Sequence, residues 1–152
     1  MIEGVEIKQL VTHPDERGFF REIVRSTEDV VREGWKQISH SLMHPGVAKA
    51  WHLHKTQIDW WYVPVGDLKV ALYDTRNGSA TKGELQELFV GEHYEAQLVK
   101  IPPGVAHGCR VIGGTAHLIY LTSGTYDPDE EGRLDHDDPS IGYDWTALPE
   151  IK

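Results

Sequence analysis

Hydrophobic residues recur at every second position over several short stretches of this chain, which is the periodicity of half-buried β-strands. The clearest example is residues 67–74, and residues 96–101 and 116–122 are further candidates. Turn-forming residues at 65–67 predict a hairpin before the first stretch, and the Pro-Pro-Gly sequence at 102–104 must end the second. The pattern therefore predicts an all-β protein made of many short strands.

One segment near the N-terminus has the start and stop signals of a helix. Ser26 or Thr27 can cap its start, and the acidic residues Glu28 and Asp29 suit its positive N-terminal end. Gly34 can end it in a left-handed conformation. We expect a short helix at the periphery of the sheet.

The chain has 152 residues, which is enough for one compact core and too few for two ordinary domains. We therefore expect residues 1–152 to form a single domain. After Tyr126 the sequence becomes acidic and rich in turn residues, before Trp145 and Leu148 add apolar side chains. We interpret residues 127–152 as an acidic tail docked on that domain.

Composition and charge narrow the classes of partner. Charged residues make up 26% and hydrophobic residues 39%, and no apolar run approaches the roughly 20 residues of a membrane span. The net charge of −9 disfavours nucleic acid as a partner. The N-terminus lacks the features of a secretory signal, and a lone cysteine, Cys109, fits a reducing compartment as a buried small residue. We expect a cytoplasmic protein without membrane or nucleic-acid partners.

The candidate chemistry centres on histidine. His52 and His54 are two residues apart on a predicted strand, so both imidazoles point to one face, while Trp51 and Leu53 form the opposite, packed face. His107 follows a proline-glycine turn and can enter the same cavity. Inside a barrel these imidazoles would need partners, and a metal ion or an anionic substrate would give them a common one. The alternative is a pair of solvent-exposed histidines without a role.

Two chemistries fit such a site. Three imidazoles and a carboxylate, from His52, His54, Asp59 and His107, could bind Zn, Fe, Ni or Mn with positions open for a ligand, as in an oxygenase or a small-molecule sensor. A metal-free cavity would instead use a neutral histidine as general base on an acidic C–H beside a ketone. The residues alone leave both possibilities open.

Motif spacing suggests a fold for this site. Residues 46–66 carry glycine, His-x-His, a carboxylate and glycine at intervals that resemble the first cupin motif, with Asp59 where that motif usually has glutamate. Residues 102–107 resemble part of the second motif, although Ala96 and Val111 replace its glycine and its asparagine. The resemblance implies a double-stranded β-helix, also called a jelly-roll barrel.

A more specific resemblance extends over almost the whole chain. The stretches that carry it are Asp15 to Glu22, Gln37 to Ser41, Gly46 to His52, Val65 to Asp67, Asp74 to Arg76, Ile101 to Gly108, Ile119-Tyr120 and Asp138 to Trp145. In this order they resemble the dTDP-4-dehydrorhamnose 3,5-epimerase family of the cupins, of which this chain looks like a divergent member.

The resemblance implies an activity and a set of residues. The family removes a proton next to the C4 ketone of a nucleotide-linked deoxysugar and returns one on the opposite face, at C3 and C5. By position, His52 matches the base and Tyr120 the proton donor, while Lys49 stands where an arginine holds phosphate. The expected substrate-binding residues are Arg17, Phe19, Glu22, Gln37, Lys49, His54, His107 and Tyr126.

The resemblance also implies partners. We expect a nucleotide-linked sugar as substrate, no cofactor, and a homodimer that pairs through its N-terminal strands, so that Arg17 and Phe19 can reach the partner subunit. A divalent metal is expected only if the metal alternative holds.

Some positions depart from the family pattern. Asp59 replaces a lysine of the nucleotide site, and Val70 replaces an aspartate of the following strand. The family's base is oriented by an aspartate that follows a Leu-Pro-Glu stretch, and no aspartate follows residues 148–150 here. The run from His52 to Lys55 resembles that of sugar-nucleotide 3,4-ketoisomerases, which use it without metal. A ketoisomerase therefore remains an alternative activity.

Overall fold

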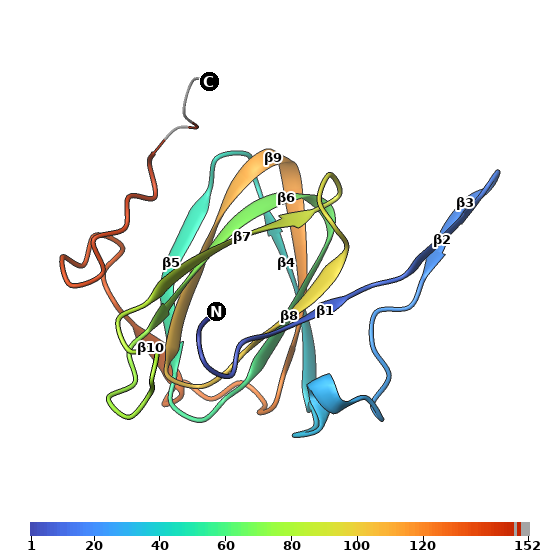
Figure 1. The fold of residues 1–152 in the computed structure, drawn as a ribbon. Helices are drawn as coiled ribbons and strands as arrows, with labels where there is room; N and C mark the ends of the chain where they lie inside the picture. Colours follow the sequence, from blue (N-terminus) through green and yellow to red (C-terminus); the bar gives the residue numbers. More distant parts are fainter. Residues whose placement is uncertain (148, 150–152) are drawn as a thin grey trace.

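Two long antiparallel strands, β6 (Asp59–Asp74) and β9 (Val105–Thr122), form the centre of the computed structural model, which describes residues 1–147 and 149. The other strands of their sheet are β1 (Glu6–Gln9), β4 (Gln37–Met43), β5 (Ala48–His54), β7 (Leu85–Gly91), β8 (Gln97–Ile101) and β10 (Glu131–Arg133). The order is β1-β8-β6-β9-β5-β10, with β4 also paired to β9 and β7 to β6. The sheet curls into a barrel (Figure 1), so the predicted all-β jelly roll is confirmed.

The predicted hairpin turn at residues 65–67 is wrong, because β6 continues through it. Gly66 has φ +72°, and the pairing of β6 with β9 shifts register on both sides of it. A side chain at this position would collide with the carbonyl oxygen of Thr115. The glycine therefore allows a bulge that bends one long strand, whose first part pairs with β8 and whose second part pairs with β7.

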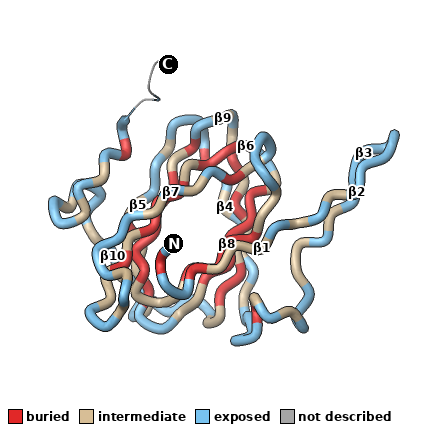
Figure 2. Tube along the Cα trace, viewed as in Figure 1, coloured by how far each residue is buried: buried red, intermediate tan, exposed pale blue. Residues whose placement is uncertain are grey.

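The strand predictions at 96–101 and 116–122 are confirmed as β8 and the second part of β9. The alternation predicted for residues 67–74 is also found. Leu68, Val70 and Leu72 are at most 1% exposed and belong to the main core inside the barrel. Burial concentrates along the strands that line this interior (Figure 2). The apolar face of each strand thus packs the barrel, as the period of two requires.

The predicted helix is a single 3-10 turn, η1 (Asp29–Val31). No side chain caps its N-terminus, so neither Ser26 nor Thr27 has the predicted role. The turn ends at Val31 with Arg32 as its C-cap, so Gly34 is not the residue that ends it; Gly34 follows two residues later in a left-handed conformation, with φ +77°, and donates its N–H to the carbonyl oxygen of Val31. Val31 is buried in a small cluster outside the main core, which fixes η1 at the periphery of the barrel.

A separate hairpin protrudes from the barrel (Figure 1). It consists of β2 (Thr12–Asp15) and β3 (Gly18–Arg21), which pair only with each other among the described strands. We call residues 12–21 the arm. Phe19 and Phe20 on the arm are 62% and 66% exposed. Two large apolar side chains are therefore uncovered in the single chain.

The segment after Tyr126 returns to the barrel. Strand β10 pairs with β5, and Trp145 is buried against Trp51, with their ring centroids 4.9 Å apart. Leu148 and residues 150–152 of the predicted tail lie outside the described residues. In the part of the chain that the structure describes, no helix has the length and hydrophobicity of a membrane span.

Candidate active site

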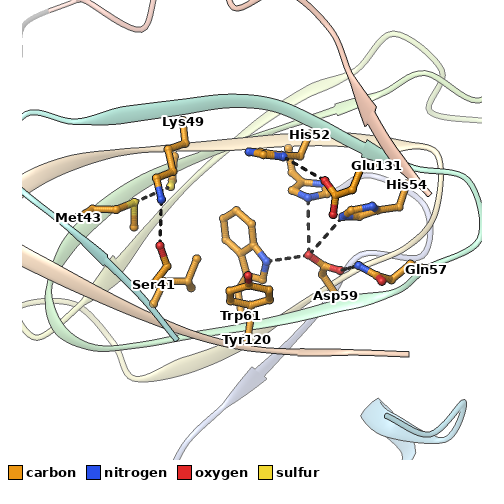
Figure 3. A pocket seen from close by; sticks show the side chains of 13 residues that line it. Ser41, Met43, Lys49, His52, His54, Gln57, Asp59, Trp61, Tyr120 and Glu131 are labelled. Carbon is orange, nitrogen blue, oxygen red and sulfur yellow. Dashed lines mark hydrogen bonds and ion pairs between the residues drawn. The ribbon is translucent and has the colours of Figure 1, made fainter. Parts of the chain in front are cut away.

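A cavity of about 190 Å³ opens into the barrel between β5, β6 and β9. Of the residues predicted from the sequence, those that line it are Lys49, His52, His54, Asp59, His107 and Tyr120. Figure 3 shows the side chains of Lys49, His52, His54, Asp59 and Tyr120 around the cavity. The structure therefore brings together residues that come from three strands.

The alternation of β5 positions the first two histidines. His52 and His54 both line the cavity, while Trp51, two residues before Leu53, is fully buried on the other face of the sheet. Leu53 packs in the same cluster as Trp51. Strand β9 pairs antiparallel with β5 in a register that sets His107 opposite His52. The predicted convergence of the three imidazoles on one cavity is thus observed.

The deepest part of the cavity holds a carboxylate between two imidazoles. The Nε2 atoms of His54 and His107 each lie 3.7 Å from Oδ2 of Asp59. The indole of Trp61 donates to the same oxygen at 3.2 Å, and the amide of Gln57 donates to Oδ1 at 2.9 Å. His54, Asp59 and His107 are all buried. We call these three residues the floor cluster.

Backbone carbonyls fix the tautomers of both floor histidines. Nδ1 of His107 lies 3.0 Å from the carbonyl oxygen of Val105, and Nδ1 of His54 lies 3.3 Å from that of Glu130. A carbonyl oxygen only accepts hydrogen bonds, so each Nδ1 carries a proton and donates it. The Nε2 atom of each ring is therefore directed toward Asp59.

Burial and charge set the protonation of the floor cluster. Burial lowers the pKa of His107 to about 4, so this ring is neutral near pH 7. Burial also acts to lower the pKa of His54, but contact with Asp59 outweighs it and raises the pKa. Burial acts to raise the pKa of Asp59, whereas His54 and His107 lower it overall. Asp59 is therefore a carboxylate that can hold a cation.

His52 lies above this cluster, nearer to the solvent. Its side chain is 29% exposed, and its Nδ1 atom lies 4.0 Å from Oε2 of Glu131 on β10. Burial lowers the pKa of His52, and the charge of Arg133 adds to this effect. The imidazole is therefore neutral at pH 7 and can accept a proton.

Tyr120 and Lys49 supply the complementary groups. Figure 3 shows the Tyr120 phenol across the cavity from His52. Lys49 Nζ donates to Ser41 Oγ at 3.0 Å, and Lys49 is the one lysine or arginine among the described residues that line the cavity. The cavity thus combines a neutral base, a phenol on the opposite side and a single flexible cation.

Three predicted binding residues lie on or beside the arm and do not line the cavity of their own chain. The side chain of Arg17 is 84% exposed and pairs with Asp15. Phe19 is largely exposed, and Glu22 forms an ion pair with Arg25. They are separated from the cavity because the arm protrudes from the barrel. Their predicted contact with substrate remains a prediction for a neighbouring subunit.

Gln37 and Tyr126 lie close to each other but not in the cavity lining. The side-chain oxygen of Gln37 accepts a hydrogen bond from the backbone N–H of Tyr126 at 2.8 Å. Tyr126 itself is 70% exposed. Gln37 positions the segment that begins at Tyr126, and a direct contact with substrate remains a prediction for both residues.

Sequence reasoning missed several residues of the site. Those with polar groups in the lining are Ser41, Gln57, Trp61 and Glu131. Trp61 could have been found, because it lies two residues after Asp59 and so shares its face of β6. Glu131 could not, because nothing in its acidic surroundings predicts that β10 pairs with β5.

The set of four metal ligands predicted for the alternative chemistry needs a correction. Within the described residues, the group close enough to share one ion consists of His54, Asp59 and His107, without His52. His52 is excluded because its Nδ1 atom faces Glu131, nearer to the mouth of the cavity.

The fold and the site together define the class of protein. An antiparallel β-barrel with histidines pointing into its interior is a cupin.

Similarity to known proteins identifies the family. The model of the dTDP-4-dehydrorhamnose 3,5-epimerase family matches residues 1–152. A relative in Bacillus subtilis, the spore coat polysaccharide biosynthesis protein SpsL, is 47% identical, with 97% of this chain and 98% of that protein aligned. The probable low-salt glycan biosynthesis epimerase Agl13 of Haloferax volcanii is 39% identical, over 96% of each chain. This chain belongs to the dTDP-4-dehydrorhamnose 3,5-epimerase family.

Solved structures agree with this assignment. A dTDP sugar isomerase from Desulfovibrio desulfuricans superposes with a TM-score of 0.90 at 29% identity, covering 97% of this chain and 94% of that one. The RmlC epimerase of Legionella pneumophila, in complex with dTDP-4-keto-L-rhamnose, gives a TM-score of 0.87 at 25% identity. The superposition covers 100% of this chain and 84% of that one. The similarity supports the epimerase interpretation, not the oxygenase or sensor alternative.

Proposed function

We propose that this protein epimerises a nucleotide-linked 4-keto-6-deoxy sugar by moving a proton at a carbon next to the ketone. One observation carries the proposal: a neutral imidazole, His52, faces a phenol, Tyr120, across the same cavity. Inversion of a carbon needs a base on one face of the sugar and an acid on the other. Family membership and the ligand of the Legionella relative support the class of substrate.

In this proposal His52 removes the proton and the electron pair of the C–H bond moves toward the ketone oxygen, forming an enolate. Tyr120 then donates a proton to the opposite face of the same carbon. The Glu131 carboxylate, 4.0 Å from His52 Nδ1, orients the ring and stabilises its charge while it holds the proton. Lys49 supplies positive charge to the diphosphate as a point charge, not as a bidentate fork.

We also propose that two copies pair through their arms. The exposed Phe19 and Phe20 would be covered in such a dimer, and Arg17 could then supply the second cation for a diphosphate. Sedimentation of the wild-type protein should give twice the mass of the chain, and a Phe19→Ser, Phe20→Ser variant should sediment as a monomer. A cytoplasmic location and the absence of nucleic-acid partners stay predictions.

Hydrogen exchange in D₂O tests the reaction. The wild-type protein should incorporate deuterium from solvent beside the ketone of dTDP-4-keto-6-deoxyglucose, observed by proton NMR. His52→Asn should lower this rate by about 100-fold to 10,000-fold because it removes the base. Full exchange in that variant would contradict the role of His52.

A matched control and the product distinguish the alternatives. His40→Asn removes an exposed imidazole, paired with His117 outside the cavity, and should exchange at the wild-type rate. Inversion at C3, C5 or both supports the epimerase. Migration of the ketone from C4 to C3 would instead establish the 3,4-ketoisomerase alternative that the His-x-His pair favours.

A further inference from the structure

We infer that the floor cluster binds the hydroxyl group on C3 of the sugar, so that the enzyme selects substrates with a hydroxyl beside the ketone. The inference rests on the proposed function, because it names the part of that substrate that His54, Asp59 and His107 contact. The three side chains are buried and come from β5, β6 and β9. The strand pairing of the barrel therefore sets their positions.

The distances within the cluster fit one bridging oxygen atom. Nε2 of His54 and Nε2 of His107 each lie 3.7 Å from Oδ2 of Asp59, and the facing atoms of the three side chains all lie within 4.8 Å of one another. A separation of 3.7 Å is too long for a direct hydrogen bond. An oxygen atom just above the triangle of these atoms would lie about 2.8 Å from each, which is an ordinary hydrogen-bond length.

The hydrogen-bonding groups of the cluster match a hydroxyl. Nδ1 of His107 donates to a backbone carbonyl and the buried ring is neutral, so its Nε2 atom only accepts. Oδ2 of Asp59 accepts as well. Burial acts to lower the pKa of His54, but contact with Asp59 raises it overall, so Nε2 of this ring donates. A hydroxyl both accepts and donates, and can therefore connect the donor of His54 with the two acceptors.

The same groups disfavour the ketone oxygen of the sugar at this position. A ketone oxygen only accepts hydrogen bonds, so it would pair with His54 and face the lone pairs of Asp59 and His107. Any negative charge that it gained during the reaction would be repelled by the Asp59 carboxylate. The cluster therefore selects a hydroxyl and not the ketone.

The position of the cluster selects the hydroxyl on C3. Lys49 is exposed and the floor cluster is buried, and Figure 3 shows Lys49 and His54 at opposite ends of the cavity. A cavity of about 190 Å³ is smaller than the roughly 300 Å³ at which pockets hold drug-sized ligands, so the sugar enters and the diphosphate on C1 stays near Lys49. Carbons C3, C4 and C5 then face the floor. In a 4-keto-6-deoxyhexose, C3 is the one of these three that carries a hydroxyl.

Burial makes this contact selective. A site built to hydrogen-bond a hydroxyl rejects an analogue without it, because the buried polar groups of the protein are then left unpaired. Here those groups include a carboxylate, Asp59, which is 4% exposed. Hydrogen bonds to charged groups are the stronger kind, so loss of the C3 hydroxyl should be costly.

Two deoxy analogues test the inference on the wild-type protein. dTDP-4-keto-6-deoxyglucose, its 2-deoxy analogue and its 3-deoxy analogue all keep hydrogens on C3 and C5, so proton NMR can follow deuterium exchange beside the ketone in each. Relative to the parent sugar, kcat/KM should fall by at least about 10-fold for the 3-deoxy sugar and by less than about 3-fold for the 2-deoxy sugar. Equal values for the three sugars, or a larger fall for the 2-deoxy sugar, would overturn the inference.

The variant Asp59→Asn shows whether the floor cluster causes the difference. It replaces a charged acceptor with a neutral amide, so kcat/KM for the parent sugar and the 3-deoxy sugar should come within about 3-fold of each other. The intrinsic reactivity of the sugars cancels between the two proteins, and a merely structural role of Asp59 would leave their ratio unchanged. Asp129→Asn, at an exposed position, should keep the wild-type ratio. A wild-type ratio in Asp59→Asn would contradict the inference.

Direct binding keeps the two proposals separable and needs no variant. By calorimetry, wild-type protein should bind the 3-deoxy sugar with a Kd at least about 10-fold above that of the parent sugar, whether or not protons exchange. Exchange at the same rate with all three sugars would leave the epimerase and remove the hydroxyl site. A difference in Kd without any exchange would leave the hydroxyl site and remove the proposed function. Binding of none of the sugars would remove both.

Discussion

Nδ1 of His52 lies 4.0 Å from Oε2 of Glu131, although the two residues are far apart in the chain. Their proximity results from the pairing of β10 with β5, in which Glu131 is opposite His54 and Arg133 is opposite His52. The family's pattern implies an aspartate for the base beyond residue 150, and Glu131 provides a carboxylate at the base from another element. We expect this contact to matter for proton transfer.

Replacing Glu131 with glutamine tests that contact. The variant should lower kcat for deuterium exchange by about 10-fold, with a smaller effect on KM, because the charged imidazole that forms during proton transfer loses a stabilising carboxylate. Steady-state exchange kinetics by NMR measure both constants. Glu95→Gln, at an exposed loop position, is the matched control. An unchanged kcat in Glu131→Gln would show that His52 acts without this carboxylate.

A second prediction concerns stability and pH. The buried Asp74 carboxylate accepts hydrogen bonds from Arg76, Ser79 and Thr81, and the contact with Arg76 holds its pKa well below the ordinary value. A carboxyl with a depressed folded-state pKa stabilises the fold above its unfolded pKa of about 3.9 and loses this contribution as the pH falls further.

Asp74→Asn should therefore lower the free energy of unfolding at pH 7 by about 3 kcal/mol. The difference from wild type should shrink as the pH falls below about 4, because the wild-type carboxyl then becomes protonated in the unfolded chain. Urea unfolding at several pH values measures this. Asp129→Asn, at an exposed position, should leave stability unchanged. A difference that stays constant down to pH 2 would contradict the assignment.

A third prediction separates two costs of replacing a glycine by alanine. One is the cost of a left-handed backbone conformation, and the other is the cost of a steric clash. Gly66 has a positive φ and lies against the backbone of Thr115, whereas Gly114 has φ +63° and open space, with no atom within 4 Å of where a Cβ would lie. Gly114→Ala should lower the free energy of unfolding by about 1 kcal/mol, the cost of the left-handed conformation alone. Gly66→Ala should cost about 1 to 3 kcal/mol more, because the backbone must move. Equal values in thermal or urea unfolding would mean that the bulge relaxes freely.

The sequence predicts those parts of the molecule that follow from local periodicity. Alternation predicts correctly that His52 and His54 share one face of β5. It also predicts correctly that Leu68, Val70 and Leu72 share one face of β6. It fails at Gly66, because one glycine with a positive φ serves equally in a tight turn and in a bulge. Only the pairing of β6 with β9 on both sides distinguishes the two.

The site was predictable as far as it depends on motif spacing, which correctly places His52, His54, Asp59 and His107 around one cavity. Pairing between distant strands decides the rest: β10 brings Glu131 to His52, and the register of β4 places Ser41 beside Lys49. The strand pairing within one chain does not decide the role of Arg17, Phe19 and Glu22. These residues lie on or beside the protruding arm, so their role depends on what the arm contacts.

The central claim is that His52 and Tyr120 act on opposite faces of one carbon, and the variant Tyr120→Phe tests it most directly. In D₂O with a dTDP-4-keto-6-deoxy sugar, this variant should exchange the proton next to the ketone at close to the wild-type rate, because His52 is intact. Inversion of that carbon should slow by about 100-fold, because the acid on the far face is missing. Inversion at the wild-type rate in Tyr120→Phe would contradict the account.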